Sequence, residues 1–473
     1  MEMLINGAWV ATRERIDVID PWDGSVVDTV PRGTAARVGE AVTAAAAAFK
    51  SWRFVPVHER MRVLRAAADD VASHLEDYAT LIAREGSKTI REARKEARRC
   101  VNTLSLSAEE ARRLYGQTVP FDSFPGGENR HGYWLREPIG VVAAITPFND
   151  PLNLVAHKLG PAIAAGNTVV LKPATVTPLS AIRLAQAFQA AGLPPGVLNV
   201  VTGHGHEIGD TLVADERVRM ISFTGGVEAG LAITRKAGLK KIGMELGSNS
   251  PVIVLADADF DRAVADTVSG AFWAAGQNCI GVQRVYVERA IFDRYLEAFV
   301  AQAKAYKVGP KLDEDCSMGP VITEGEARRI ASWVSEARTA GATVHCGGTR
   351  GGSVGTVIPP TVLTGVTMAM KLGCEEVFGP TVALWPVDSL EQAVELANSV
   401  NYGLHAAIFT RSLASAHYAI RHLECGGVIV NDSTDYRLDQ MPFGGIKHSG
   451  LGREGVAFSL LEMTEPKLVC FTE

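Results

Sequence analysis

Apolar residues recur at helical spacing from residue 34 to residue 115, which predicts a series of helices in this part of the chain. Thr34 is of a residue type favoured as an N-cap, and Gly86 closes a helical pattern that begins near Val57. Residues 116–136 then change to Pro, Gly and aromatic residues, a composition that predicts a hairpin projecting from the body of the protein.

From about residue 139, short apolar runs alternate with helical patterns. Such alternation predicts parallel strands joined by crossover helices, as in dinucleotide-binding domains. The first set has predicted strands at Gly140–Thr146, Thr168–Leu171, Val197–Val201, Met220–Thr224 and Lys241–Glu245, with helices at Ser180–Ala191 and Val227–Ala237. A second α/β set follows residue 250, with predicted strands at Val252–Leu255, Arg284–Glu288, Thr361–Leu363, Thr381–Trp385, His405–Phe409 and Gly427–Asn431.

The densest cluster of basic residues lies inside the first helical region. Mixed charges at helical spacing are typical of a helix face exposed to water, so we expect this cluster to be solvated. Its members are Arg91, Arg94, Lys95, Arg98 and Arg99, interleaved with Glu92 and Glu96.

Composition limits the class of protein. A chain of 473 residues is too long for one hydrophobic core, and a net charge of −6 argues against a nucleic-acid partner. No apolar run approaches the ~20 residues needed to cross a bilayer, and the opening MEMLINGAWV lacks a secretory signal. The seven cysteines include no CxxC pair, so we expect no bound metal and free thiols in a cytoplasmic, reducing compartment.

A glycine-bearing turn is the first candidate for chemistry. In FTGGVEAG, Gly225 and Gly230 fall where a strand ends and a helix begins. Glycine lets the backbone approach a phosphate, and the helix N-terminus offers it free N–H groups. Glycines at such turns also serve packing, and this motif alone leaves both interpretations open.

Three further motifs carry candidate catalytic side chains, one in a predicted loop and two at the ends of predicted strands. Cys279, in AGQNCI, is a candidate nucleophile, although free cysteines more often pack in cores. Glu245, in MELGSNSP, is expected to point into the crevice where α/β proteins bind ligands, unless it is a surface acid or a cap. Asn149, in TPFND, also follows a strand and is otherwise the N-cap of the next helix.

These four motifs, in this order, resemble the aldehyde dehydrogenase superfamily. The resemblance starts with ING-x-W at Ile5–Trp9 and continues through LKPA at 171–174, EEVFGP at 375–380 and MPFGGIKHSGLGREG at 441–455. It covers essentially the whole chain, and seven motifs in the right order and spacing are highly specific. The resemblance implies an NAD(P)-dependent enzyme that oxidises an aldehyde.

The resemblance also implies three catalytic residues. Cys279 is then the nucleophile that adds to the aldehyde carbon, and the Asn149 amide with the backbone N–H of Cys279 stabilises the oxyanion. Glu245 matches the general base that activates water to hydrolyse the thioester. Members that transfer the acyl group to coenzyme A do not need this base, so its presence favours a free acid as product.

For the cofactor, the resemblance implies contacts of Lys172 with the adenosine ribose and of Glu376 with the nicotinamide ribose. Thr175 stands where members committed to NAD often carry Glu, and a neutral hydroxyl neither repels a 2′-phosphate nor holds the free diol strongly. We therefore expect NAD as cofactor, with NADP tolerated. The predicted cofactor-binding residues are Thr146, Pro147, Phe148, Lys172, Thr175, Gly205, Gly225, Gly226, Gly230, Glu376 and Phe378.

A polar substrate pocket is expected beside the nucleophile. A helix opened by Asn149 would place Asp150, Asn153, Leu154 and His157 on one face, which by resemblance lines the substrate tunnel. Three of these four residues are polar, whereas the stripe is largely apolar in members that act on fatty or aromatic aldehydes. The predicted substrate-contacting residues are Asp150, Asn153, His157, Asn278, Arg437 and Phe443.

Arg437 matches a tunnel position that is aromatic in those members. A guanidinium there is suited to bind an anionic head group bidentately, or else it pairs with Asp150, Asp435 or Asp439. The expected substrates are lactaldehyde, succinate semialdehyde, or a phosphonate or sulfonate aldehyde. PFND and ELGSNSP are similar to the phosphonoacetaldehyde dehydrogenase branch, although a basic residue in place of Asn278 would suit a dianion better.

Alternatives remain at this stage: an enzyme that acylates coenzyme A with a semialdehyde, a cysteine hydrolase or amidase using Cys279 with His157 and no NAD, and an inactive protein of this fold. The expected architecture is α/β: a Rossmann-like dinucleotide-binding domain, a catalytic α/β domain and a small β oligomerisation element that makes a homodimer or homotetramer. The three parts are residues 1–115 with 137–247, residues 248–448, and residues 116–136 with a C-terminal strand in 449–473.

Overall fold

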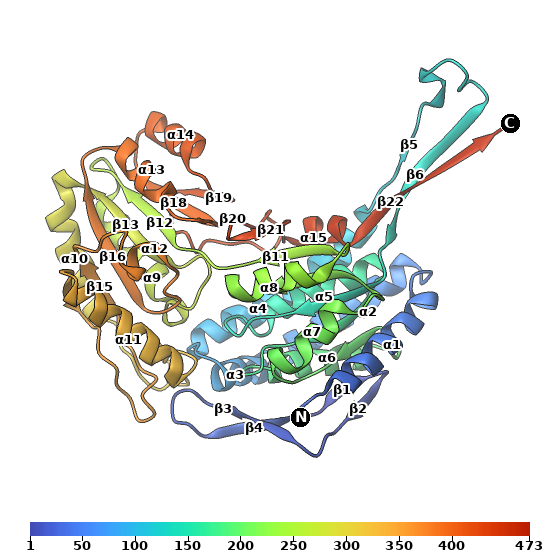
Figure 1. Ribbon diagram of the computed structural model, residues 1–473, viewed down its shortest axis with the longest axis horizontal. Helices are drawn as coiled ribbons and strands as arrows, with labels where there is room; N and C mark the ends of the chain where they lie inside the picture. The colour runs from blue at the N-terminus through green and yellow to red at the C-terminus, as the bar shows by residue number, and fades with distance from the viewer.

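The computed structural model describes residues 1–473 and contains two large sheets and a projecting arm (Figure 1). The first sheet has eight strands in the order β2-β1-β9-β8-β7-β10-β11-β21. Its strands are β1 Met3–Ile5, β2 Ala8–Val10, β7 Val141–Ile145, β8 Thr168–Lys172, β9 Leu198–Val200, β10 Val218–Thr224, β11 Lys241–Glu245 and β21 Gly450–Leu451.

The order of the five central strands creates a ligand crevice. The chain runs from β7 outward through β8 to β9, then returns to the other side of β7 for β10 and β11, and all neighbours in this set are parallel. Adjacent crossovers leave β7 and β10 in opposite directions, so a crevice opens at their carboxyl ends. Thr146 and Gly225 follow these two strands directly.

Helices cover both faces of this sheet because its central strands are apolar on both sides. Along β7, Val141 and Ala143 join one core with α1 and α7, whereas Val142 and Ala144 join the other core with α2, α4, α5 and α6. These helices are α1 Ala35–Trp52, α2 Val57–Ser73, α3 Leu75–Glu85, α4 Ile90–Glu110, α5 Asn153–Ala165, α6 Leu179–Ala190, α7 Gly205–Ala214 and α8 Val227–Ala237.

The second sheet has seven strands in the order β14-β15-β16-β13-β12-β18-β19, and every neighbouring pair is parallel except β14 with β15. Its strands are β12 Ser250–Val254, β13 Val282–Glu288, β14 Thr343–Cys346, β15 Thr361–Thr364, β16 Thr381–Val387, β18 His405–Phe409 and β19 Gly427–Val430. Its helices are α9 Phe260–Phe272, α10 Phe292–Lys304, α11 Glu324–Thr339, α12 Lys371–Cys374, α13 Leu390–Asn398 and α14 Leu413–His422.

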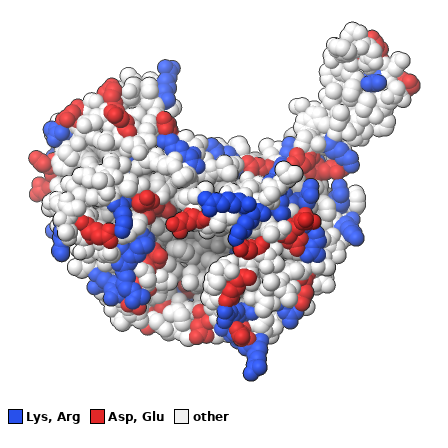
Figure 2. Space-filling model, viewed as in Figure 1, with Lys and Arg blue, Asp and Glu red and all other residues white.

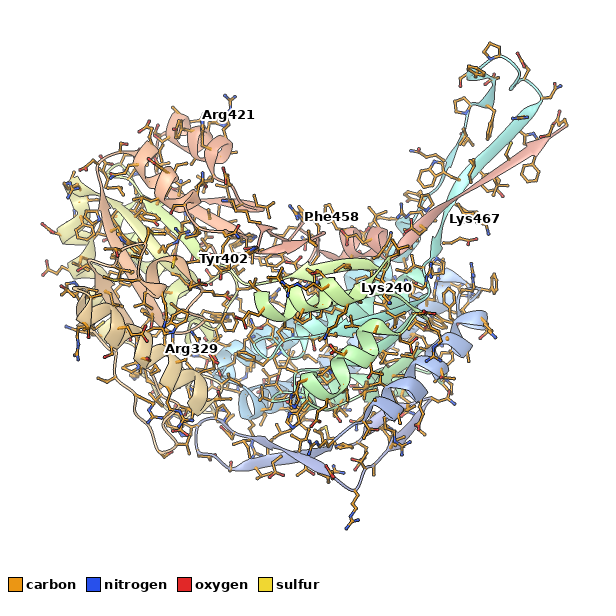
Figure 3. All side chains as sticks on the ribbon, in the orientation of Figure 1. Lys240, Arg329, Tyr402, Arg421, Phe458 and Lys467 are labelled. Atoms are coloured by element: carbon orange, nitrogen blue, oxygen red, sulfur yellow. The ribbon has the colours of Figure 1, made fainter.

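The arm extends away from both sheets (Figure 1) and consists of β5 Gln117–Thr118, β6 Arg130–Pro138 and β22 Thr464–Thr472. β22 pairs antiparallel with β6 over nine residue pairs, from Thr464 opposite Pro138 to Thr472 opposite Arg130. Lys467, on the outer part of the molecule in Figure 3, lies on this strand and pairs with Glu137 at 3.1 Å. The C-terminal strand therefore pairs with β6 of its own chain, and its other edge has no neighbouring strand.

The structure differs from the predicted organisation at both ends of the chain. Residues 449–463 belong with the first sheet instead of the arm, because β21 pairs with β11, and α15 (Val456–Glu462) packs on α5. The N-terminal strands, including the hairpin of β3 (Arg15–Ile19) and β4 (Val26–Pro31), were missed because short, half-exposed runs carry little periodic signal. Two-residue strands β17 Tyr402–Gly403 and β20 Ile446–Lys447 form a separate pair.

The predicted helical region of residues 34–115 is confirmed, except that one predicted helix is two helices in the structure. Thr34 caps α1 by accepting from the N–H of Arg37, whereas the pattern from Val57 to Gly86 is split at His74 into α2 and α3. None of the helices is both long and apolar enough to cross a membrane.

Candidate active site

Cys279 lies in the loop between α9 and β13 and faces a cavity of about 370 Å³. The cavity is lined by α4, by the turn after β7, by the Cys279 loop and by the segment after β19. Figure 2 shows a hollow near the middle of one face, between the parts that carry α8 and α11, with both basic and acidic side chains around it. The charged lining residues of the cavity at Cys279 are Lys88, Lys95, Glu96, Arg99, Asp150, Asp266, Asp432, Asp435 and Arg437.

The cavity brings together residues that are far apart in the sequence. Asn149, Asp150, Asn278, Cys279 and Arg437, all predicted as site residues, line it. The nucleophile candidate therefore stands beside the candidate oxyanion amide, among charged side chains.

The prediction that Asn149 opens a helix is wrong. The helix α5 begins at Asn153, its N-cap position is Leu152, and Asn149 and Asp150 lie in the turn before it. Pro151 explains the difference, because the residue before a proline is disfavoured in the α region. Asn149 is thus not an N-cap, and its amide is free to face the cavity.

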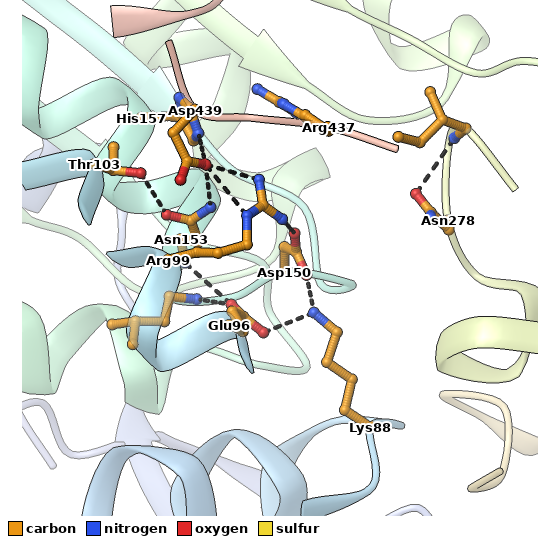
Figure 4. A network of polar contacts seen from close by, with 12 residues as sticks. Lys88, Glu96, Arg99, Thr103, Asp150, Asn153, His157, Asn278, Arg437 and Asp439 are labelled. Atoms are coloured by element: carbon orange, nitrogen blue, oxygen red, sulfur yellow. Dashed lines mark hydrogen bonds and ion pairs between the residues drawn. The ribbon is translucent and has the colours of Figure 1, made fainter. Parts of the chain in front are cut away.

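Asn153 and His157 are buried and do not line the cavity as expected of substrate contacts. Both reach Asp439 instead, with Oδ1 of Asp439 at 3.3 Å from Nδ2 of Asn153 and 3.1 Å from Nε2 of His157 (Figure 4). Arg99 and Asn102 bind the same carboxylate at 2.8 Å and 3.0 Å. Burial opposes ionisation of Asp439, but these partners, His157 and Arg99 above all, hold its pKa well below the ordinary value.

Arg437 pairs with none of the three aspartates named as alternatives. Its Nη2 donates to Oε2 of Glu454 at 3.1 Å, and its guanidinium carbon lies 3.6 Å from the ring centroid of Phe443. Lys158 also donates to Glu454, at 2.9 Å. The Arg437 guanidinium is therefore held by Glu454 and Phe443, while Phe443 itself is buried behind the cavity.

Glu245 ends β11 and is buried next to these charges. Its Oε2 has no hydrogen-bond partner, and a Cβ at Gly444 would lie only 3.0 Å from its Oε1. Burial, followed by the nearby Glu454 carboxylate, raises the pKa of Glu245 well above its usual value. A buried acid with a raised pKa and an oxygen without a hydrogen-bond partner is suited to proton transfer.

The Cys279 thiol packs against the buried side chains of Ile280, Leu404 and Phe443. Burial raises the pKa of Cys279 to about 12, and Arg437 lowers it less than burial raises it. Glu376 and Glu245 add to the rise. The thiol is therefore mostly protonated at neutral pH, so it needs a proton acceptor before it attacks.

This pKa predicts how alkylation of the apoenzyme depends on pH. Because only the thiolate reacts, the rate of Cys279 modification by iodoacetamide is expected to rise about tenfold per pH unit from about pH 7 to about pH 10. Peptide mass spectrometry of time-quenched samples measures this rate at each pH. A plateau below about pH 9 would contradict the raised pKa.

A second group of polar residues surrounds the crevice between β7 and β10. The hydroxyls of Thr146 and Thr224 are buried without hydrogen-bond partners. Lys172 is buried with a single hydrogen bond, from Nζ to the carbonyl of Pro173 at 3.1 Å, and burial lowers its pKa to about 8. Hydrogen-bond donors and acceptors are therefore free to bind a ligand at the carboxyl ends of these strands.

The glycines of the β10–α8 turn differ in whether the surrounding side chains leave room for a Cβ atom. A Cβ at Gly225 would lie 2.6 Å from the Phe223 ring, and one at Gly230 would lie 2.6 Å from Leu246, so packing requires glycine at both positions. Gly226 meets nothing within 4 Å, and it is the N-cap of α8 with no side chain to bind the first N–H groups. Gly205, at the start of α7, is equally open.

Glu376 and Phe378 approach from the second sheet. Oε1 of Glu376 accepts from the backbone N–H of Ser248 at 2.8 Å, and burial raises its pKa to about 7. Phe378 has φ of +46° and its ring packs edge-on against Phe148, 5.6 Å between centroids. Arg329 on α11 (Figure 3) donates to the carbonyl of Val377 at 2.6 Å and holds this turn.

The sequence profile of the aldehyde dehydrogenase family matches residues 9–469. The chain belongs to the aldehyde dehydrogenase family. The resemblance of the motifs is thereby confirmed, as is an NAD(P)-dependent enzyme that oxidises an aldehyde.

Relatives of this aldehyde dehydrogenase cover it almost completely. An aspartate-semialdehyde dehydrogenase 1 from Pseudomonas canavaninivorans is 48% identical over 98% of this chain and 98% of its own length. A 3-sulfolactaldehyde dehydrogenase from Priestia megaterium is 44% identical over 99% of this chain and 97% of its own. The crystal structure of aldehyde dehydrogenase 21 from Physcomitrella patens, in complex with the reaction product succinate, has a TM-score of 0.96 and 37% identity, and covers 100% of this chain and 98% of that one.

The crevice of this aldehyde dehydrogenase fits a dinucleotide. Thr146, Thr224 and Lys172 offer polar atoms that the protein itself leaves unused or nearly so, and the open start of α8 offers N–H groups to a phosphate. Pro147 lies in the turn after β7, beside this crevice. Thr175 donates to the carbonyl of Gly203 at 3.0 Å and brings no charge to the site.

The part of the site that α4 provides was not predicted from the sequence. The cluster interpreted as a solvated face contains Lys95 and Arg99, which line the cavity, and Glu92 and Glu96, which are buried. The signal was the spacing: Glu92, Glu96 and Arg99 share one helix face with the apolar residues of α4. Glu454 was also missed, since nothing in its local sequence indicates a buried partner for Lys158.

Proposed function

We propose that this enzyme oxidises a short polar aldehyde with an acidic far end to the carboxylate, through a thioester on Cys279. The observation that carries the proposal is the cavity at Cys279. Only seven of its 21 lining residues are hydrophobic, and its volume of about 370 Å³ suits a small ligand. The named substrates and product of the three relatives (aspartate semialdehyde, 3-sulfolactaldehyde and succinate) are all acidic.

Acylation begins when the Cys279 thiol gives its proton to solvent water in the cavity and the thiolate adds to the aldehyde carbon, so that the carbonyl oxygen becomes an oxyanion. The Asn149 amide and the backbone N–H of Cys279 donate to that oxyanion and lower the barrier by about 3 kcal/mol. Bound NAD(P)+ supplies the hydride acceptor that converts the adduct into a thioester. Thr175 neither repels nor pairs with a 2′-phosphate, which supports NAD with NADP tolerated.

Glu245 then acts on water. Its carboxylate takes a proton from a water molecule, the hydroxide adds to the thioester carbon, and the Cys279 thiolate leaves as the carboxylic acid forms. Glu454 and burial support this role, because a raised pKa makes Glu245 a stronger base. Transfer to coenzyme A would not use this carboxylate.

Lys95 is the cation best placed to meet the acidic end of the substrate. Its Nζ lies 4.5 Å from the ring centroid of Trp273, it lines the cavity, and it makes no ion pair. Arg437 remains a candidate, but its side chain is 8% exposed and paired with Glu454. Asp432 and Asp435, on the same lining, suit a hydroxyl or ammonium group of the substrate.

The substitution Lys95→Met tests the proposal. We expect KM for succinate semialdehyde to rise about tenfold while KM for propanal changes less than about twofold, since only the acidic aldehyde loses a charge partner. Initial rates of NAD(P)H formation give both values. Arg98→Met, on the same helix but outside the cavity, is the control, and Arg437→Leu compares the second cation. Equal rises for both aldehydes, or faster oxidation of propanal by the wild type, would refute the acidic substrate.

The arm supports a homodimer or homotetramer. β22 pairs only with β6, so its other edge offers nine residues of unpaired backbone, with Leu468 and Phe471 exposed. An open edge of this length favours pairing with another copy of the chain.

A further inference from the structure

Two buried carboxylates lie one helical turn apart on α4. Glu92 is 5% exposed and Glu96 is 2% exposed, although both come from a stretch rich in charge. Residues at i and i+4 project from the same face of a helix. Both carboxylates therefore point from one rigid element toward the same part of the protein, the side where the cavity lies.

Glu96 holds the turn that carries Asn149. Its Oε1 accepts from the backbone N–H groups of Leu152 and Asn153, at 2.8 Å and 3.0 Å, where α5 begins (Figure 4). Lys88 donates to Oε2 of Glu96 at 2.7 Å and also contacts the Asp150 carboxylate. The turn between β7 and α5 is thus held after Pro151 by Glu96 of α4 and before Pro151 by Lys88, which directly precedes the N-cap of α4.

Glu92 holds the loop that carries Cys279. Its Oε1 accepts from the backbone N–H of Ala274 at 2.8 Å, and its Oε2 accepts from Thr89 in the capping box of α4. Ala274 and Ala275 have φ of +49° and +55°, a region that residues with a Cβ adopt only when surrounding contacts impose it. The Glu92 contact is one of those that hold this conformation.

The two loops belong to different sheets, and the oxyanion needs one donor from each. We infer that α4 is the positioning element of the oxyanion site: Glu96 places the side-chain amide of Asn149, and Glu92 places the backbone N–H of Cys279. The inference rests on the proposed roles of Asn149 and Cys279. Both glutamates act through backbone N–H groups of these two loops, and Glu92 lies outside the lining of the cavity, so we treat both as positioning residues.

Glutamine at these positions keeps the size of the side chain but changes its hydrogen bonding. In Glu92→Gln one of the two accepting oxygens becomes a donor that faces an N–H group, and in Glu96→Gln the new amide donor faces Lys88. We expect each substitution to lower kcat about 10- to 100-fold with KM changed less than about threefold. The rate of Cys279 alkylation by iodoacetamide needs no oxyanion donor and is expected to stay within about twofold.

A double-mutant cycle separates this inference from the proposed function. If Glu96 acts through Asn149, Glu96→Gln combined with Asn149→Ala is no slower than Asn149→Ala alone. Multiplying effects would overturn the inference, whereas an Asn149→Ala enzyme with wild-type kcat would overturn the proposed oxyanion site itself. Glu109→Gln, at the exposed end of α4, is the control.

Lys88→Gln provides a second, milder variant if Glu96→Gln does not fold. It retains a donor toward Glu96 but shortens the side chain, and we expect kcat to fall about tenfold, again without a further loss in the Asn149→Ala background. Thermal unfolding confirms which variants are folded. A Lys88→Gln enzyme whose alkylation rate and kcat fall in parallel would show general loosening of the site and overturn the inference.

Discussion

Replacing Cys279 by alanine is expected to eliminate aldehyde oxidation, with kcat lowered about 10⁵-fold or more. No substitute thiol is present, because none of the other six cysteines lines the cavity. Without the nucleophile the covalent route through the thioester is closed, and only the rate acceleration from substrate binding and charge stabilisation remains. The absorbance of NAD(P)H measures the rate, and intact-mass spectrometry is expected to show no acyl adduct.

The matched control is Cys346→Ala. Cys346 lies on the edge strand β14 and donates its thiol to the carbonyl of Pro360 at 3.4 Å, with no part in the cavity. This variant should keep wild-type kcat and form the same adduct. Substantial oxidation by Cys279→Ala, with the protein folded, would refute the thioester mechanism.

Replacing Glu245 by glutamine is expected to lower steady-state kcat about 10²- to 10³-fold while the first turnover stays fast. The amide fits the same buried space but cannot accept a proton from water, so hydrolysis slows more than acylation. Stopped-flow absorbance should then show a burst of NAD(P)H equal to the enzyme concentration. Mass spectrometry should find the acyl group on Cys279.

Glu424→Gln controls for the loss of a negative charge alone, since Glu424 forms a surface ion pair with Lys447. We expect no burst and unchanged kcat from that variant. A Glu245→Gln enzyme that slows without any burst would place Glu245 in the acylation step. If the wild type turned over rapidly only after coenzyme A was added, and the product was an acyl thioester of coenzyme A, the assignment of hydrolysis would fail.

The strands were predictable because their signal is local. Buried parallel strands such as β8 and β18 appear as short apolar runs between turn residues, and their predicted limits agree with the structure within one or two residues. The start of α5 was predicted four residues too early, because the apolar pattern carries no information on the conformation that Pro151 imposes on the residue before it. The strands at the N-terminus are too short to show a clear alternation of apolar and polar residues.

The supporting contacts of the site were not predictable in the same way. Glu96 binds a backbone N–H 56 residues away, and Glu92 binds one 182 residues away. A charged residue on a helix looks the same in sequence whether it faces water or a distant buried N–H group. Cys279 and Asn149, which lie in loops, were predicted because the order of the motifs identified them, whereas the residues that contact these loops belong to no such motif.

The position of the last 24 residues in the fold has a consequence for biosynthesis. β21 closes the edge of the eight-stranded sheet, and Glu454 neutralises Lys158, whose side chain is 1% exposed in α5. An unmatched buried ammonium is strongly destabilising, so the first half of a nascent chain cannot reach its final packing while Glu454 is still inside the ribosome. Translation that stops before Gly450 leaves a polypeptide with an open sheet edge and an uncompensated charge, a ready target for proteases and aggregation.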